Sequence, residues 1–168
     1  MSKLPIKALA ALALIACAGF LVFRAFRSPR DESEGKIYFY DESLKKLFAA
    51  PRDSIPPIPG LDNAEPDGVR AIVIAPGGDP KNSKDRRIAY LEKYTPELKR
   101  QFEAVRQMGA AAEAAPGTLQ REMIPANTLV RRENEAQWHP VNSPEGDRIV
   151  TEWNVPGPNG TYPAVCVP

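Results

Sequence analysis

The hydrophobic positions of the chain form one long run near the N-terminus and several short runs after it. The long run covers residues 8–23 without a polar interruption, and three arginines follow it between positions 24 and 30. As a helix the run is about 24 Å long, against a bilayer core of about 30 Å. Snorkelling of the first arginine brings two further residues into the apolar span. The pattern predicts a transmembrane helix over residues 8–26, within a membrane anchor of residues 1–27.

Two cleaved forms are alternatives to this anchor. The small residues Ala16 and Ala18 offer a signal-peptide cleavage site after Ala18, and residues 14–17 resemble a bacterial lipobox in which Cys17 is lipidated. Both alternatives expect a polar chain soon after the cut, whereas the hydrophobic run continues through Phe23. The sequence therefore favours the retained anchor, followed by a polar tether over residues 28–35.

The charges that flank the anchor do not fix its orientation. Lys3, Lys7 and the terminal amine on one side balance the three arginines on the other. A very short, positively charged N-terminus before a sizeable domain usually stays in the cytoplasm while the domain crosses. We therefore expect a single-pass protein of the inner membrane with an extracytoplasmic domain over residues 36–168.

Strands are predicted in the first half of that domain. A β-rich run at residues 37–40, a polar turn at 41–46 and an apolar run at 47–50 predict a hairpin. The nearly continuous apolar run that begins at Val69 and stops at Pro76-Gly77-Gly78 predicts a central strand buried on both faces. Residues 86–94 alternate and predict another strand.

A helix is predicted to begin at Thr95-Pro96-Glu97, which combines an N-cap hydroxyl, a proline at the first position and an acid in the first turn. Its expected buried face is formed by Leu98, Phe102, Val105, Met108 and Ala112.

The remaining elements are shorter. Residues 127–141 predict a second hairpin, and Ser143-Pro144 begins a short helix with Ile149, Val150 and Trp153 on its apolar side. Residues 162–167 can add an edge strand. The sum is an α+β domain of about five strands, with one amphipathic helix and one short helix.

Neither the composition nor the motifs of this domain indicate a catalytic reaction or a bound ligand. The balance of 22 basic and 21 acidic residues argues against a nucleic-acid partner. With Cys17 in the hydrophobic run, Cys166 is the one thiol of the domain, which excludes a disulfide framework and a thiolate zinc site. The lone His139 has no motif for a nucleophile around it. We therefore assign no catalytic, cofactor-binding or metal-binding residues and expect no cofactor.

Four segments of the domain are similar to segments of other proteins: "IYFYDESLKKLFAAP", "VRAIVIA", "IAYLEKYTPELK" and "NSPEG". Together they resemble a group of small uncharacterised bacterial proteins with one N-terminal hydrophobic segment before a compact exported domain. The resemblance implies a bacterial origin and an exported domain, and it implies no activity.

The expected function is that of a non-enzymatic binding or scaffold module, or an accessory subunit of a membrane assembly, whose partners are the membrane and other membrane-protein subunits. One alternative is a membrane-tethered hydrolase with a carboxylate site, and another is a domain that binds envelope polymers. Aromatic residues often anchor interfaces, so the candidate interaction residues are Tyr38, Tyr40, Trp138 and Trp153. The competing interpretation of these four residues is packing in the core.

Overall fold

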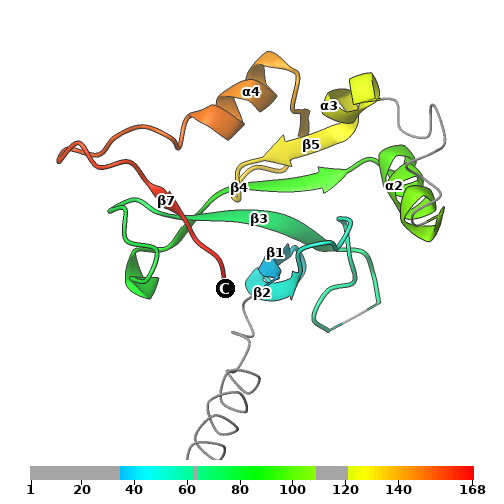
Figure 1. Ribbon diagram of the computed structural model, residues 1–168, viewed down its shortest axis with the longest axis horizontal. Helices are drawn as coiled ribbons and strands as arrows, with labels where there is room; N and C mark the ends of the chain where they lie inside the picture. The colour runs from blue at the N-terminus through cyan, green and yellow to red at the C-terminus, as the bar shows by residue number, and fades with distance from the viewer. Residues whose placement is uncertain (1–34, 63, 109–120) are drawn as a thin grey trace, which may run out of the picture. The chain divides into compact units, whose positions relative to one another are not determined.

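A seven-stranded antiparallel sheet is the frame of the chain over residues 35–62, 64–108 and 121–168, which are the residues that the computed structural model describes (Figure 1). The strands are β1 (Lys36–Asp41), β2 (Lys46–Pro51), β3 (Gly68–Ala75), β4 (Arg87–Tyr94), β5 (Thr128–Arg131), β6 (His139–Pro140) and β7 (Ala164–Val165). They lie in the order β2-β1-β3-β4-β5-β6, and β7 pairs with β3. The predicted α+β class is confirmed.

The helices are α2 (Pro96–Met108), α3 (Ile124–Asn127) and α4 (Pro144–Thr151), with 3-10 turns η1 (Ser83–Asp85) and η3 (Arg121–Met123). The predicted transmembrane helix over residues 8–26, its alternative lipidation site Cys17 and most of the tether lie outside the described residues. Within the described ranges, no helix has the length and apolar character needed to cross a membrane.

The first hairpin forms as predicted. Phe39 of β1 pairs with Phe48 of β2, and their ring centroids are 5.9 Å apart. Asp41 closes the turn because its carboxylate accepts hydrogen bonds from the backbone N–H groups of Ser43, at 3.0 Å, and Leu44, at 2.7 Å. Such side-chain bonds to the backbone two or three residues on are typical of turn-forming Asp.

The predicted central strand is β3. It pairs with β1, β4 and β7, and Val69, Val73 and Ile74 are almost completely buried. The buried cluster around it consists of Tyr40, Val69, Ala71, Val73, Ala75, Leu91 and Cys166. A strand with neighbours on both sides and apolar residues on both faces explains the nearly continuous hydrophobic run.

Helix α2 begins where its start signal predicts. Leu98 is buried, and the ring of Phe102 lies 5.0 Å from that of Tyr94 on β4. The predicted buried face is wrong at Met108, which is 47% exposed. Helix α2 packs on the sheet through its first turns beside the end of β4, so its last residues have no sheet beneath them (Figure 1). Ala112 lies outside the described residues.

Helix α4 also begins as predicted. The Ser143 hydroxyl accepts a hydrogen bond from Gly146 N at 3.0 Å, and Ile149 is completely buried. The helix lies over β4 and β5 (Figure 1). Within the described residues the sheet has seven strands, where about five were predicted. The predicted second hairpin over residues 127–141 forms as β5 and β6, and the edge strand that residues 162–167 could add forms as Ala164–Val165.

Candidate binding surface

The four aromatic candidates lie in different surroundings. Tyr40 is 3% exposed and belongs to the buried cluster, and the half-buried Tyr38 and Trp138 pack against that cluster. Trp153 lies just beyond α4, where it lines a groove. The interpretation as core packing therefore holds for Tyr40. Trp153 lies at a different place on the domain from the other three aromatic residues.

Tyr38 and Trp138 are already occupied by cationic side chains of the same domain. The Tyr38 hydroxyl accepts a hydrogen bond from Arg86 Nη1 at 2.6 Å. Lys93 Nζ lies 4.1 Å and Arg131 Cζ 4.8 Å from the ring centroid of Trp138. Cations at these distances are attracted to the π-system of the ring. Both aromatic residues thus serve contacts inside the domain.

Arg131 organises the loop that follows β5. It is 4% exposed, and its Nη1 donates to the carbonyl oxygens of Arg132 (3.1 Å), Glu133 (2.9 Å) and Glu135 (2.6 Å). Its Nη2 donates to Glu42 Oε1 at 2.6 Å. One buried guanidinium therefore holds the loop and connects it to the turn between β1 and β2.

A hollow of about 590 Å³ lies between this loop and that turn. Its lining is mixed in charge and consists of Tyr40, Glu42, Lys45, Arg131, Glu133, Asn134, Glu135 and Ala136. Burial is the main cause that raises the pKa of the Tyr40 phenol, and the nearby Glu133 carboxylate adds to it. Arg131 Nη2 and Glu42 are paired with each other, and Arg131 Nη1 is bonded to the loop carbonyls, so much of this lining is internally paired.

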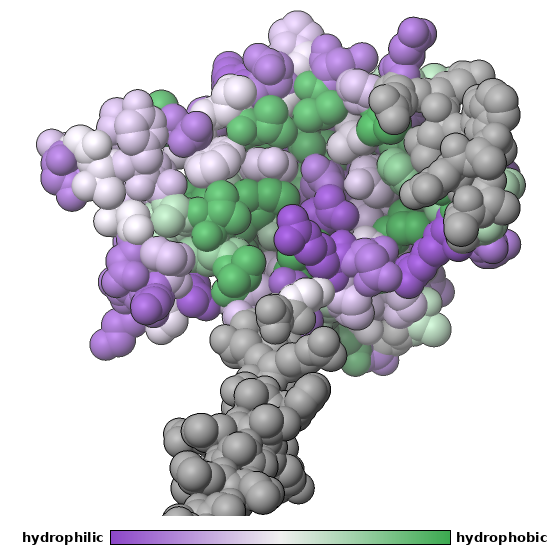
Figure 2. Space-filling view, in the orientation of Figure 1, coloured by the Kyte–Doolittle hydropathy of each residue, from purple (hydrophilic) through white to green (hydrophobic). Residues whose placement is uncertain are grey.

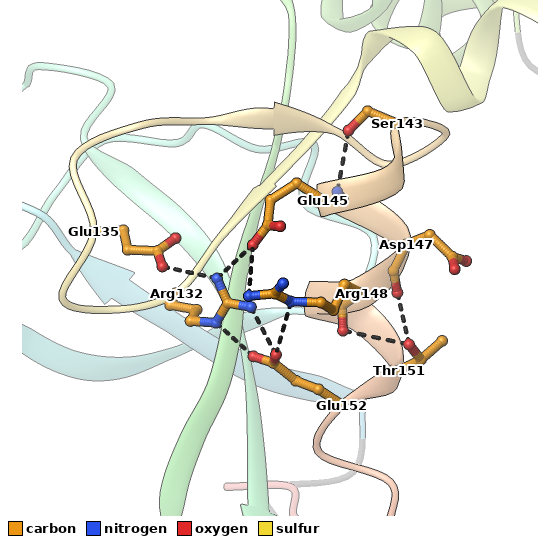
Figure 3. A network of polar contacts seen from close by, with 9 residues as sticks. Arg132, Glu135, Ser143, Glu145, Asp147, Arg148, Thr151 and Glu152 are labelled. Carbon is orange, nitrogen blue, oxygen red and sulfur yellow. Dashed lines mark hydrogen bonds and ion pairs between the residues drawn. The ribbon is translucent and has the colours of Figure 1, made fainter.

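Arg132 forms a second ionic centre, between the loop after β5 and helix α4 (Figure 3). Its Nε and Nη2 bind the two carboxylate oxygens of Glu152 at 2.5 and 2.6 Å, and its Nη1 contacts Glu135 at 2.7 Å and Glu145 at 2.8 Å. Arg148 lies 3.6 Å from Glu145 and 3.9 Å from Glu152. This network ties α4 to the loop after β5.

The network favours the ionised form of two carboxyl groups, those of Glu145 and Glu152. Hydrogen bonds from Arg132 are the first cause that lowers the pKa of Glu145 and of Glu152, and the same bonds raise the pKa of the Arg132 guanidinium. Hydrogen bonding and opposite charge both favour the ionised form. These groups are therefore ionised at neutral pH, which suits them to ion pairing and leaves them no proton to donate as a general acid.

Glu92 behaves in the opposite way. Burial raises its pKa, while Arg70, whose Nη1 lies 2.8 Å from Glu92 Oε1, works against that rise. Arg70 also lies 6.0 Å from the ring centroid of Tyr94. Among the described carboxyl groups with a shifted pKa, Glu92 is the one shifted upwards, and its partner is a cation instead of a second acid. No three His, Cys, Asp or Glu side chains of the described ranges are grouped as a metal site requires.

The groove beside Trp153 has a volume of about 560 Å³. Its lining is rich in prolines and consists of Pro76, Gly77, Arg87, Glu152, Trp153, Val155, Pro156, Gly157, Pro158, Asn159 and Pro163. The indole Nε1 of Trp153 is buried and has no hydrogen-bond partner in the part of the chain that is described. This groove was not predicted from the sequence. The signal available was the density of prolines in the segment after Trp153.

An apolar strip on the C-terminal segment adjoins the groove. We define it as Val155, Tyr162, Val165 and Val167, whose exposed fractions are 57–58%. Cys166 N donates to Val73 O at 2.8 Å, which turns the Cys166 side chain into the core and leaves Val165 and Val167 outside. Hydrophobic residues gather on the face over β3 and β7 (Figure 2).

No protein-family model, no curated protein and no solved structure matches this chain. Its function must therefore be argued from the chemistry of these surfaces.

Proposed function

We propose that this chain is a single-pass inner-membrane protein, anchored by a transmembrane helix over residues 8–26, whose α+β domain is extracytoplasmic. In this proposal the domain is a non-enzymatic binding or scaffold module, or an accessory subunit of a membrane assembly. The observation that carries the binding role is the apolar strip. Val165 and Val167 lie two residues apart around β7 and therefore on the same side of the chain, and like Val155 and Tyr162 they are more than half exposed, which is the exposure expected of an apolar surface that a partner covers.

The strip lies on a segment that the domain already holds in place. Val165 belongs to β7, whose partner β3 is mostly buried, and Val167 follows the anchored Cys166. A partner therefore meets side chains whose backbone is ordered before binding. Preorganised side chains lose less conformational entropy when a partner binds them.

The pairing of the carboxyl groups favours a binding role for the domain over the activity of a hydrolase. Hydrolysis by two carboxyl groups needs an acid that holds its proton beside a base that does not. Glu145 and Glu152 are instead held ionised by one arginine, and Glu92 is paired with Arg70. The pairing of each group with a guanidinium favours a structural role for all three.

The anchor is tested by the intact mass of the protein from the membrane fraction of its own host. We expect the mass of the full chain, allowing for loss of Met1. A mass that begins at Cys17 with acyl chains, or at Gly19, would contradict the anchor. Digestion of spheroplasts by added protease tests the orientation, and resistance of the domain in intact spheroplasts would place it in the cytoplasm.

Photo-crosslinking in living cells tests the binding role. A photoreactive phenylalanine analogue at Val165 is expected to give one adduct with a defined membrane protein, identified by mass spectrometry. The matched control carries the analogue at the exposed Asp147 of α4 and should give no such adduct. Equal labelling at the two positions, or none at Val165, would count against a partner at the strip.

A further inference from the structure

We propose that the outer edge of strand β2 pairs with the same edge of a second copy of this chain, so that two domains form one continuous antiparallel sheet. The pairing is two-fold symmetric about Phe48, in the middle of β2. The inference goes beyond the binding function proposed above and uses a different part of the domain from the apolar strip. Three properties of β2 support it: its place in the sheet, the spacing of its outward backbone groups and the side chains beside them.

Strand β2 lies at one end of the sheet. Within the described residues it pairs with β1 along its whole length and with no other strand. The strand at the opposite end is β6, which has two residues and ends in a proline. The edge of a terminal strand is a row of N–H and C=O groups with which a strand of another chain can pair. Of the two ends of the sheet, β2 is the one long enough to accept a strand.

The backbone groups that point away from β1 belong to Leu47 and Ala49. Arg52 N donates to Gly35 O at 2.7 Å, so the N–H of this residue points towards the β1 side. Directions alternate along an antiparallel pair, and the groups of Pro51, Ala49 and Leu47 therefore point outward. Pro51 has no N–H, and an edge strand tolerates a proline at such an outward position. The outer edge thus offers two N–H donors and two C=O acceptors.

These four groups complement a second copy of themselves. When two β2 strands run antiparallel about an axis at Phe48, Leu47 of each copy lies opposite Ala49 of the other. The two residues of such a pair exchange both of their N–H···O bonds. Four hydrogen bonds between the copies then satisfy every outward group of Leu47 and Ala49. An axis at Ala49 would instead set Leu47 opposite Pro51, which has no N–H to donate.

The side chains beside these groups fit the same register. Leu47 is 40% exposed and Ala49 is also exposed, so the pairing sets a large side chain of one copy beside a small one of the other. Phe48 lies on the other face of the sheet, half-buried, with its ring centroid 5.9 Å from that of Phe39. At the axis it lies opposite Phe48 of the second copy. Aromatic residues directly opposite each other stabilise an antiparallel pair.

The charge pattern of β2 also permits the pairing. The one charged residue of the strand, Lys46, lies opposite the apolar Ala50 of the second copy in this register. Like charges opposite each other would destabilise the pair, and the residues of β2 place none there. The contact is short, but an anchor that holds both copies in one membrane raises their effective concentration. Weak edge pairing is then sufficient for a dimer.

Photo-crosslinking in living cells tests the occupant of the edge. A photoreactive phenylalanine analogue replaces Ala49 in the full chain. We expect an adduct with twice the mass of the chain, whose cross-linked peptide contains Leu47 of the second copy. The matched control carries the analogue at Ala104, an exposed alanine of α2, and should give no such adduct.

Variants of the full chain in detergent micelles test the register, with the dimer fraction measured by analytical ultracentrifugation. Ala49→Pro removes an N–H that points out of the sheet, and with it two hydrogen bonds of the dimer, so the dissociation constant should rise about tenfold. Ala49→Lys should also raise it, because the two new ammonium groups lie diagonally across the strand pair. Ala104→Lys adds the same charge on α2 and should leave it unchanged. Near-UV circular dichroism checks that each variant is folded.

Absence of the double-mass adduct at Ala49 would overturn the inference, and so would equal double-mass adducts at Ala49 and Ala104. An adduct of Ala49 with a different protein would show that a foreign strand occupies the edge. A dimer that Ala49→Lys leaves intact would contradict the pairing through β2. A specific Val165 adduct without the double-mass adduct leaves the proposed binding function standing while this inference fails, and the opposite result leaves the dimer without the strip as an interface.

Discussion

Replacing Gly146 by alanine should destabilise the domain, although alanine is the better helix former. Gly146 is buried in the first turn of α4, facing the chain that connects β6 to the helix. A Cβ built at this position would lie 2.0 Å from the carbonyl oxygen of Pro140 and 2.9 Å from Val141 Cα. Both neighbours are backbone atoms, so neither can rotate away.

The expected loss of stability follows from how far the new Cβ and the Pro140 carbonyl oxygen must move apart. Real Cβ atoms keep at least 3.0 Å from such an oxygen, so the gap has to open from 2.0 to 3.0 Å. The backbone of Pro140–Ser143 resists because Val141 N donates to Thr128 O and Ser143 N to Pro140 O, both at 2.9 Å. Forced shifts of this kind cost about 3 kcal/mol at the upper end of overpacking. The higher helix propensity of alanine offsets about 1 kcal/mol of this cost. The free energy of unfolding should therefore fall by about 2 kcal/mol.

The assay is thermal unfolding of the full chain in detergent, followed by near-UV circular dichroism. For a domain of this size 1 kcal/mol corresponds to about 4 °C, so the Tm should fall by about 8 °C. Gly157→Ala is the control, because its Cβ would meet the nearest atom, Asn159 Oδ1, at 3.4 Å, and its Tm should change little. A Gly146→Ala protein as stable as the parent would refute the close packing of α4 on Pro140.

Three further predictions concern titration and hydrogen bonding. The pKa values of Glu145 and Glu152 lie below the ordinary 4.5 because Arg132 donates to them, so their contribution to stability is complete above pH 4.5 and is lost as the pH falls below it. Urea unfolding between pH 3 and 6 should show this loss, and Glu152→Gln should reduce the pH dependence; an identical slope in the variant would contradict the network. Burial raises the pKa of Tyr90 to about 12, so its contribution is complete below pH 10 and is lost as the pH rises towards 12. Burial also raises the pKa of Tyr40 and of Tyr94, so an ultraviolet titration should contain several late phenolate transitions, of which Tyr90→Phe removes one near pH 12; an unchanged titration in the variant would contradict the burial of the Tyr90 phenol. Asp41→Asn should lower the Tm more than the exposed Asp79→Asn, since hydrogen bonds, first from Leu44 N and then from Leu61 N, favour the Asp41 carboxylate and lower its pKa; equal shifts would show that these bonds contribute little.

Elements encoded by neighbouring residues were predictable from the sequence. The polar turn between β1 and β2, the long apolar run of β3 and the starts of α2 at Pro96 and α4 at Pro144 all depend on residues within a few positions of one another. Local spacing determines which face of a strand or helix is apolar and which side chain can cap a helix. The sequence therefore determined the α+β class, both hairpins and the two main helix starts.

The candidate surfaces depend on residues that are far apart in the chain. Arg132 meets Glu152 twenty residues away, and Arg131 meets Glu42 across 89 residues. The groove combines Pro76 and Arg87 with the segment after Trp153, and no periodicity relates these positions. The exposure of Met108 likewise depends on where the sheet ends beneath α2. The packing of α4 brings Arg132 to Glu152, the pairing of β7 with β3 closes the groove, and the strand order β1-β3-β4-β5 brings Arg131 to Glu42. A binding surface of this kind requires distant backbone segments to be fixed side by side.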